Sequence, residues 1–243
     1  MFQEFCRRMA YVTLDNGESG TGFLFTNKDK VFFICPKHLL FTEKNYVRSQ
    51  VAQLSCIATE KETTVFATIH LNDLMDGDLI QSINFDICSL QLGELQSSKS
   101  QILNPVSDAV RLTDKSVFPH FISDIETSFS PTWDQTDDIF LASVAEHKND
   151  NLKPMLIKGR VYELDKENFR LKISHDYINH KTGGPAFQVL RVGDSDKYFR
   201  IVLIGLTLHT IPVLNLHDRS AQNKAYSMIL PIDVLPDLLD NYF

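Results

Sequence analysis

Residues Asn179–Phe187 read NHKTGGPAF. The hydroxyl of Thr182 comes directly before two glycines and a proline. Paired glycines let a backbone turn tightly through conformations that other residues rarely adopt. Such a turn can present a hydroxyl beside backbone N–H groups, which suits a nucleophile next to an oxyanion hole. An ordinary strand-to-strand turn has the same composition, so the chemical interpretation requires a histidine and a carboxylate elsewhere.

The histidine candidate is His38. Val31–Ile34 predicts a buried strand, and Pro36 is expected to end it because proline cannot donate to a strand ladder. His38 then lies just beyond the strand, on a short helical turn. Cys35, three residues earlier, is expected to be a small buried residue and not a nucleophile.

The carboxylate candidate is Asp86, within a predicted strand at Phe85–Leu92. Alternation along a strand places Asp86 on the same face as Cys88 and Leu90, so its side chain is expected to point inward. A buried carboxylate is costly unless it is paired or hydrogen-bonded. Asp86 therefore needs a partner, and a histidine is a natural one.

Composition excludes several classes of function. The chain has 243 residues, 43% of them hydrophobic, and a net charge of -7 without a basic run, so we expect no nucleic-acid partner. The four cysteines form no C-x-x-C pair, so no zinc site is expected. We find no apolar run of about 18 residues and no signal peptide, and predict a cytoplasmic protein with reduced cysteines and no membrane contact.

The predicted elements are mostly short strands bounded by turn residues, in two sets separated by residues 93–136. This pattern favours an all-β fold built as a pair of antiparallel barrels or sandwiches. The chain is long enough for one large β domain or for two lobes of roughly 100 residues each. Leucine spacing in Ile232–Asn241 predicts a C-terminal helix.

Several segments, taken in order, resemble the trypsin/chymotrypsin-like peptidases, especially their intracellular bacterial relatives without signal peptide or disulfides. The resemblance runs from about Ala10 to the end and is carried by these segments: Gly20–Leu24, Phe33–Leu40, Phe85–Leu90, Asp138–Leu141, Lys158–Val161, Thr182–Phe187, Ile204–Leu206 and Leu230–Asp233.

The resemblance implies two six-stranded antiparallel β-barrels with an active site in the cleft between them, and a C-terminal helix. The N-terminal lobe would be residues 1–110 and carry His38 and Asp86. The C-terminal lobe would be residues 111–243 and carry Thr182.

The chemistry that the resemblance implies is acyl transfer on a protein or peptide substrate, without a cofactor. Thr182 would attack, His38 would take the hydroxyl proton, and Asp86 would hold the imidazole tautomer. The backbone N–H groups of His180 and Thr182 would form the oxyanion hole.

Three residues depart from the family pattern. Thr182 stands where the family has serine, and its extra methyl stiffens χ1 and crowds the attack path. His180 replaces a glycine, and its side chain is expected to restrict the backbone and fill space near the substrate. Lys181 replaces the acidic or amide residue that usually braces this turn.

These departures leave two hypotheses open: a slow or partner-activated endopeptidase, and an inactive pseudoprotease that binds a peptide or protein partner in the old cleft. A third, an unrelated β-barrel binding module, would be discarded if His38 and Asp86 are hydrogen-bonded neighbours.

Asp176 lies six residues before Thr182, an offset at which an acid in trypsin-like members selects Lys or Arg substrates. A substrate-binding role for Asp176 is therefore one interpretation, and a solvated loop acid is the other. His175 and His180 could be imagined as metal ligands with Asp176, but no matching cluster appears elsewhere, and no metal is expected.

Overall fold

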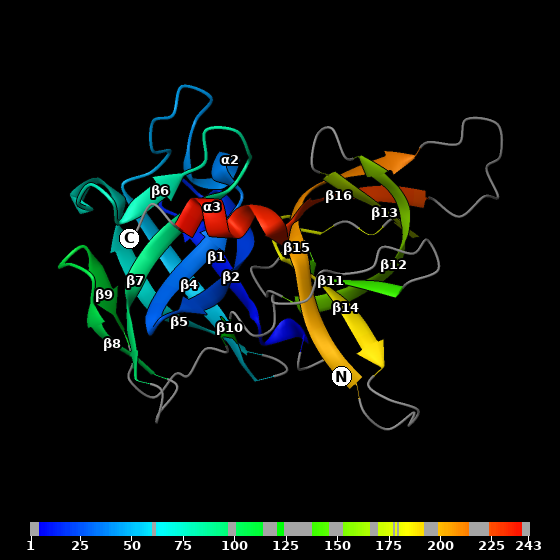
Figure 1. Ribbon diagram of the computed structural model, residues 1–243. Coiled ribbons are helices and arrows are strands. Elements are labelled where there is room, and N and C mark those ends of the chain that lie inside the picture. Colours follow the sequence, from blue (N-terminus) through cyan, green and yellow to red (C-terminus); the bar gives the residue numbers. More distant parts are fainter. Residues whose placement is uncertain are drawn as a thin grey trace.

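The computed structural model describes residues 5–59, 62–96, 101–113, 121–123, 138–145, 153–165, 170–176, 178, 180–191, 199–213 and 224–239. Most of these residues form strands, arranged in two sheets that lie side by side (Figure 1). The predicted all-β architecture is confirmed. Much of the predicted connection at 93–136, with Trp133, lies outside the described residues, as does Asn179.

The N-terminal sheet has ten strands in the described part of the chain, and eight of them follow one another in the order β6-β7-β3-β2-β1-β4-β5-β9. The short strands β8 and β10 pair with β7 and β2. The bounds are β1 Met9–Leu14, β2 Ser19–Asn27, β3 Lys30–Cys35, β4 Val51–Thr59, β5 Glu62–His70, β6 Leu79–Gln81, β7 Cys88–Gln96, β8 Gln101–Pro105, β9 Val110–Leu112 and β10 Ile122–Ser123.

The second sheet is a closed barrel in the order β11-β12-β13-β16-β15-β14. Its interior is filled by β-branched and leucine side chains such as Ile139, Ile173 and Ile229, which favour strands. The bounds are β11 Asp138–Ala145, β12 Lys153–Asp165, β13 Arg170–Asp176, β14 Pro185–Arg191, β15 Phe199–Val213 and β16 Lys224–Pro231.

One apolar cluster joins the two sheets. It combines Phe23 and Phe32 of the first sheet with Phe187 and Leu203 of the barrel, all fully buried. After β16 the chain forms a 3₁₀ turn, η3 Ile232–Val234, and then α3 Leu235–Leu239, which crosses back to β7 (Figure 1, red). The C-terminal helix is thus shorter than predicted in the part described, which ends at residue 239.

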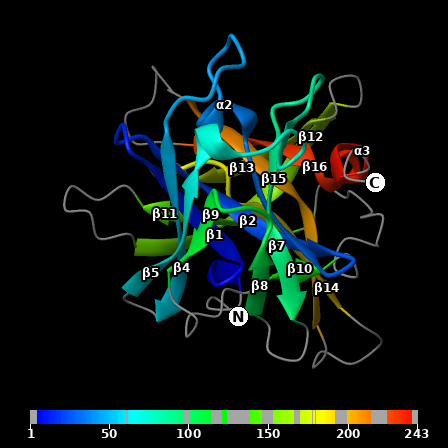
Figure 2. The ribbon, with the colours of Figure 1, turned by 90° about the vertical axis from the view of Figure 1, so that its left-hand side faces the viewer.

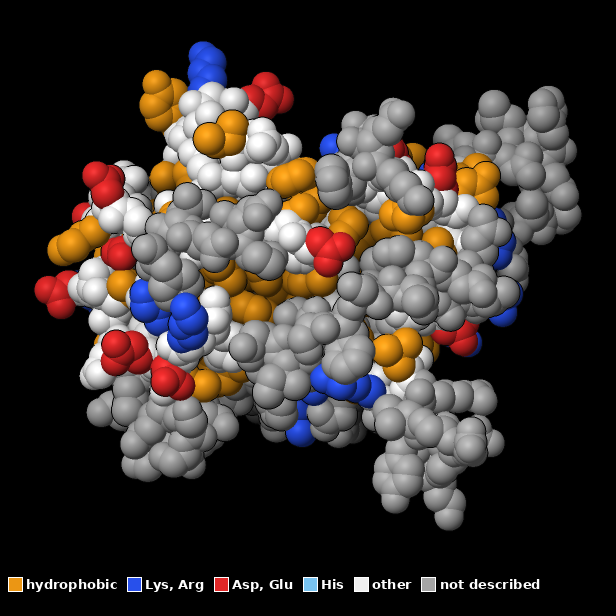
Figure 3. All heavy atoms as spheres, in the orientation of Figure 1, with side chains coloured by type: hydrophobic (Ala, Val, Ile, Leu, Met, Phe, Trp, Pro, Cys, Tyr) orange, Lys and Arg blue, Asp and Glu red, His pale blue; other side chains and the backbone are white. Residues whose placement is uncertain are grey.

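Figure 2 shows the N-terminal sheet from its outer side, with the barrel strands behind it. On the face drawn in Figure 3, the described Lys and Arg side chains form small groups, separated by acidic and hydrophobic side chains. Within the described residues, none of the helices has the length and apolar character needed to cross a membrane.

Candidate active site

His38 and Asp86 contact each other twice. Pro36 ends β3 as predicted, and the short helix α2 Lys37–Leu40 follows it and carries His38. The ring Nδ1 of His38 lies 2.6 Å from Asp86 Oδ2, and the backbone N–H of His38 donates to Asp86 Oδ1 over 2.9 Å. Because the carboxylate fixes both the ring and the backbone of His38, it sets the orientation of the imidazole.

The local structure around Asp86 differs from the prediction. Strand β7 begins at Cys88, and Asp86 lies in a bend before it, so the predicted strand start at Phe85 is wrong. The reason is Ser82, whose Oγ accepts the N–H groups of Asn84 and Phe85 over 3.3 and 3.1 Å. A serine that bonds to nearby backbone in this way competes with a strand ladder.

The contacts with His38 favour the ionised form of the Asp86 carboxyl group. Burial acts to raise the pKa of Asp86, but the hydrogen bonds and charge of His38, together with Lys37, outweigh it and lower that pKa. An ionised carboxylate only accepts hydrogen bonds, so His38 Nδ1 donates its proton to it. In the neutral ring Nε2 is then free to accept a proton, and half of the side chain (50%) is exposed.

The turn at Thr182 is clamped by both sheets. Thr21 of β2 donates twice to the Thr182 carbonyl oxygen, from its backbone N over 3.1 Å and from Oγ1 over 2.7 Å. In the barrel, Gly183 N–H donates to Thr207 O over 2.7 Å. Gly183 has φ +99, and a Cβ there would lie 2.0 Å from Thr21 O and 2.8 Å from Pro36 Cδ, so the turn requires glycine.

Two backbone N–H groups beside Thr182 remain available. Lys181 N–H donates to Val144 O over 2.9 Å, and Ser143 Oγ donates to the Lys181 carbonyl. Within the described residues, the N–H groups of His180 and Thr182 have no acceptor. Free N–H donors at alternate positions of one turn are the arrangement that an oxyanion hole uses.

The contact between nucleophile and base is not made in this structure. Among the described residues, no hydrogen bond joins the Thr182 hydroxyl to the His38 ring. The close approach of Gly183 to Pro36 nevertheless places the turn against the segment that carries His38. Catalytic hydrogen bonds in unliganded enzymes are often long and tighten only when substrate binds.

The ring of His180 turns into the barrel. The residue is only 9% exposed, its Nδ1 lies 2.8 Å from Ile178 O, and Thr210 Oγ1 lies 3.2 Å from its Nε2. His180 is not among the described residues with a positive φ. The ring therefore lies in the barrel interior, and that it restricts the backbone and fills space near the substrate stays a prediction.

Asp176 is placed away from these contacts. It ends β13, its side chain is largely exposed, and it forms an ion pair with Lys224 Nζ at 2.7 Å. That hydrogen bond and charge lower the pKa of Asp176. Within the described residues it contacts neither His38 nor Thr182, and no group of three or more His, Cys, Asp or Glu is arranged to hold a metal.

Two further residues, Thr21 and His209, have no signal in the sequence pattern. Thr21 clamps the turn, but a threonine in a strand is common and carries no signal of its own. His209 follows a bulge in β15. Its side chain is exposed, and partial desolvation together with the charges of Arg170 and His38 lowers its pKa, while the charge of Asp86 raises it.

The cysteines are free and buried, as expected for Cys35. The Sγ atoms of Cys35 and Cys88 lie 3.4 Å apart, and burial and the Cys88 thiol raise the pKa of Cys35 well above its usual value. Such a thiol is a poor nucleophile.

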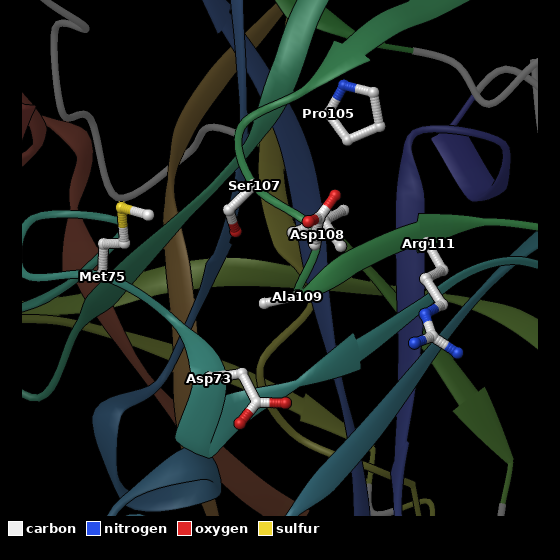
Figure 4. A pocket seen from close by; sticks show the side chains of 8 residues that line it. Asp73, Met75, Pro105, Ser107, Asp108, Ala109 and Arg111 are labelled. Carbon is white, nitrogen blue, oxygen red and sulfur yellow. The ribbon is translucent and has the colours of Figure 1, made fainter.

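Two hollows lie outside this site. One of about 710 Å³ lies between the loop after η1 (Leu71–Asp73) and β9, where Asp73, Asp108 and Arg111 line it (Figure 4). Another of about 450 Å³ is lined by His175, Asp176 and Lys224 on the barrel. Neither contains His38, Asp86 or Thr182.

No protein-family model and no curated protein sequence matches the chain. Several solved structures do match. A mutant of tobacco etch virus protease is 12% identical with a TM-score of 0.53, and the match covers 99% of this chain and 81% of that one.

A thermostable serine protease from an extremophilic microorganism is 9% identical, with a TM-score of 0.52 and coverage of 98% and 95%. Human heparin binding protein is 10% identical, with a TM-score of 0.52 and coverage of 99% and 94%. These likenesses show that the chain has the double-barrel fold of the trypsin-like serine proteases.

Proposed function

We propose that the protein is an endopeptidase that hydrolyses peptide bonds by acyl transfer, with Thr182, His38 and Asp86 as its catalytic residues. The observation that carries the proposal is the double contact of Asp86 with the ring and the backbone of a half-exposed His38. A histidine held in this way, on the fold of serine proteases and beside a turn with two N–H groups that have no acceptor among the described residues, is prepared for general-base catalysis.

In the first step, Thr182 Oγ1 attacks the scissile carbonyl carbon while His38 Nε2 takes the hydroxyl proton. The Asp86 carboxylate keeps the Nδ1 proton in place and stabilises the imidazolium that forms. The N–H groups of His180 and Thr182 donate to the oxyanion. His38 then protonates the leaving amine, the C–N bond breaks, and an acyl ester remains on Thr182.

In the second step, a water molecule replaces the amine. His38 takes a proton from the water, the hydroxide attacks the ester, and the acid product leaves as Thr182 Oγ1 regains a proton. The Thr182 methyl restricts χ1, and a misplaced nucleophile can lose about 100-fold in rate. We therefore propose a slow enzyme, or one that a protein partner activates.

A mixed peptide library, with products identified by mass spectrometry, tests this function. Wild type is expected to cleave, whereas Thr182→Ala and His38→Ala are expected to lose cleavage while keeping the wild-type melting temperature. Cleavage that persists in either variant would refute the assignment. Asp176→Asn in the same assay shows whether Asp176 selects a basic residue at the cleavage site.

The alternative function is that of a pseudoprotease that binds a peptide or protein in the cleft. The threonine at the nucleophile position favours it, because its methyl restricts χ1, and among the described residues its hydroxyl makes no hydrogen bond to the His38 ring. Cleavage that appears only in Thr182→Ser, from an inert parent, would support this alternative. Turnover by the wild-type protein would exclude it.

A further inference from the structure

We propose that a buried chain of four side chains, His180, Thr210, Ser227 and His175, positions the backbone N–H of His180 for the oxyanion, and that the two histidines share a single proton. The proposal rests on the proposed function, because it concerns the same site. It gives His180 and its partners a positioning role, since they act through the backbone N–H and do not touch the substrate.

The hydrogen-bonded side chains form a continuous row from the turn before Thr182 to strand β13 on the opposite side of the barrel. Thr210 Oγ1 lies 3.2 Å from His180 Nε2 and 2.7 Å from Ser227 Oγ, and Ser227 Oγ lies 2.8 Å from His175 Nε2. His180, Ser227 and His175 are all buried. The four residues come from the turn, β15, β16 and β13, so the contacts do not arise from neighbours in sequence.

The hydrogen-bonded side chains hold residue 180 of the turn, and separate contacts hold residues 181 and 182. The His180 ring is fixed at both nitrogens, by Ile178 O and by Thr210. Lys181 is fixed to β11 through Val144. Thr182 is fixed to β2 through Thr21. Residue 180 is therefore tied to the barrel by its side chain as well as by the backbone bridge that pairs it with Ala145, and loss of the Thr210 contact would let the N–H that the oxyanion needs move out of position.

The donors and acceptors in the chain can be counted. His180 Nδ1 faces Ile178 O, and His175 Nδ1 faces Asp176 O over 2.7 Å, so both Nδ1 atoms carry protons. In neutral rings both Nε2 atoms are then acceptors. The hydroxyls of Thr210 and Ser227 lie between the two Nε2 atoms and supply one proton each. Three contacts in the row each need one proton to become hydrogen bonds: His180–Thr210, Thr210–Ser227 and Ser227–His175. The neutral chain is one proton short, and one added proton on either Nε2 completes all three hydrogen bonds.

The surroundings of His175 and His180 shift the pKa values of the two rings in both directions. Burial lowers the pKa of both histidines, while the backbone carbonyls that accept from their Nδ1 atoms raise it. Asp176 raises and Lys224 lowers the pKa of His175, and the two rings, 6.1 Å apart, disfavour a second charge. The other charged groups around the hollow beside His175 are Asp138, Lys158 and Arg160. The pair is thus expected to take up one proton well before a second.

Thr210→Val tests the positioning role, because valine keeps the shape and removes the hydroxyl. We expect kcat to fall about tenfold or more with KM unchanged, since an oxyanion donor stabilises only the transition state. Thr210→Ser should restore most of the rate. Thr68→Val, on β5 of the other sheet, is the matched control and should leave kcat unchanged.

Long-range ¹H–¹⁵N spectra of the imidazoles give a readout that does not need turnover. In wild type the pair should titrate in two separated steps, and in Thr210→Val the first step should move to lower pH, because the added proton no longer completes the row of hydrogen bonds. Independent titration in wild type, or an unchanged kcat in Thr210→Val, would overturn the proposal. An inert wild type that shows the two separated steps would instead refute the proposed function, and leave the shared proton established.

Discussion

Thr21 donates two hydrogen bonds to the carbonyl oxygen of Thr182, and so the N-terminal sheet holds the turn of the C-terminal barrel. Thr21 is fully buried. Replacement by valine keeps the backbone bond and removes the one from Oγ1. We expect Thr21→Val to lower the free energy of unfolding by about 1 kcal/mol. Thermal or denaturant unfolding measures this change.

The same variant is expected to reduce the rate of cleavage more than the fraction of folded protein, because Thr21 holds the backbone of the nucleophile Thr182. A loss of about tenfold in kcat/KM is anticipated from a displaced turn. Thr21→Ser retains the hydroxyl and serves as the control. Wild-type activity in Thr21→Val would show that the backbone bond suffices to hold the turn.

Asp86→Asn addresses the orientation of His38. The amide keeps the shape but can donate to Nδ1, which favours the tautomer with its proton on Nε2, the wrong one for a general base. We expect kcat to fall about 10⁴-fold with KM nearly unchanged. Steady-state kinetics measure the effect. A loss of kcat smaller than the loss in His38→Ala would indicate that the His38 ring still acts as a base without the Asp86 carboxylate.

Gly183→Ala is expected to disrupt the turn. The residue has φ +99, and the added Cβ would lie 2.0 Å from Thr21 O, so neither the backbone nor the neighbour can accept it. The free energy of unfolding should fall by more than about 2 kcal/mol. Gly17→Ala, at φ +86 with no atom within 4 Å of the added Cβ, isolates the cost of the backbone angle. Equal losses in the two variants would disprove the packing argument.

Stability is expected to fall in acid. Burial lowers the pKa of His175 and His180 below their ordinary value of 6.5, so the unfolded chain binds more protons as the pH drops below that value. Asp86 adds to the loss at lower pH, because its pKa is lowered below 3.8 and protonation removes its bonds to His38. Denaturant unfolding from about pH 7 to about pH 5 should show a decreasing free energy of unfolding, with a shallower slope in His175→Gln.

Much of the fold follows from local pattern. Alternating apolar residues predict the strands, because every second side chain of a strand lies on the buried face. Pro36 predicts the end of β3, because proline cannot donate to the strand ladder. The order of His38, Asp86 and Thr182 along the chain also made their meeting an expectation. The bend before β7 was missed, since Ser82 acts on the backbone of residues 84 and 85 through a side-chain bond that periodicity does not register.

The sequence by itself determined the strands, the glycine turn and the identity of the groups that could react. Tertiary structure decided how those groups are held. Thr21 and Thr182 are 161 residues apart, and Thr210 reaches His180 from another strand, so no local rule brings them together. Because hydrogen bonds depend on distances of a few tenths of an ångström, only the packed sheets decide that the His180 ring turns inward and bonds to Thr210.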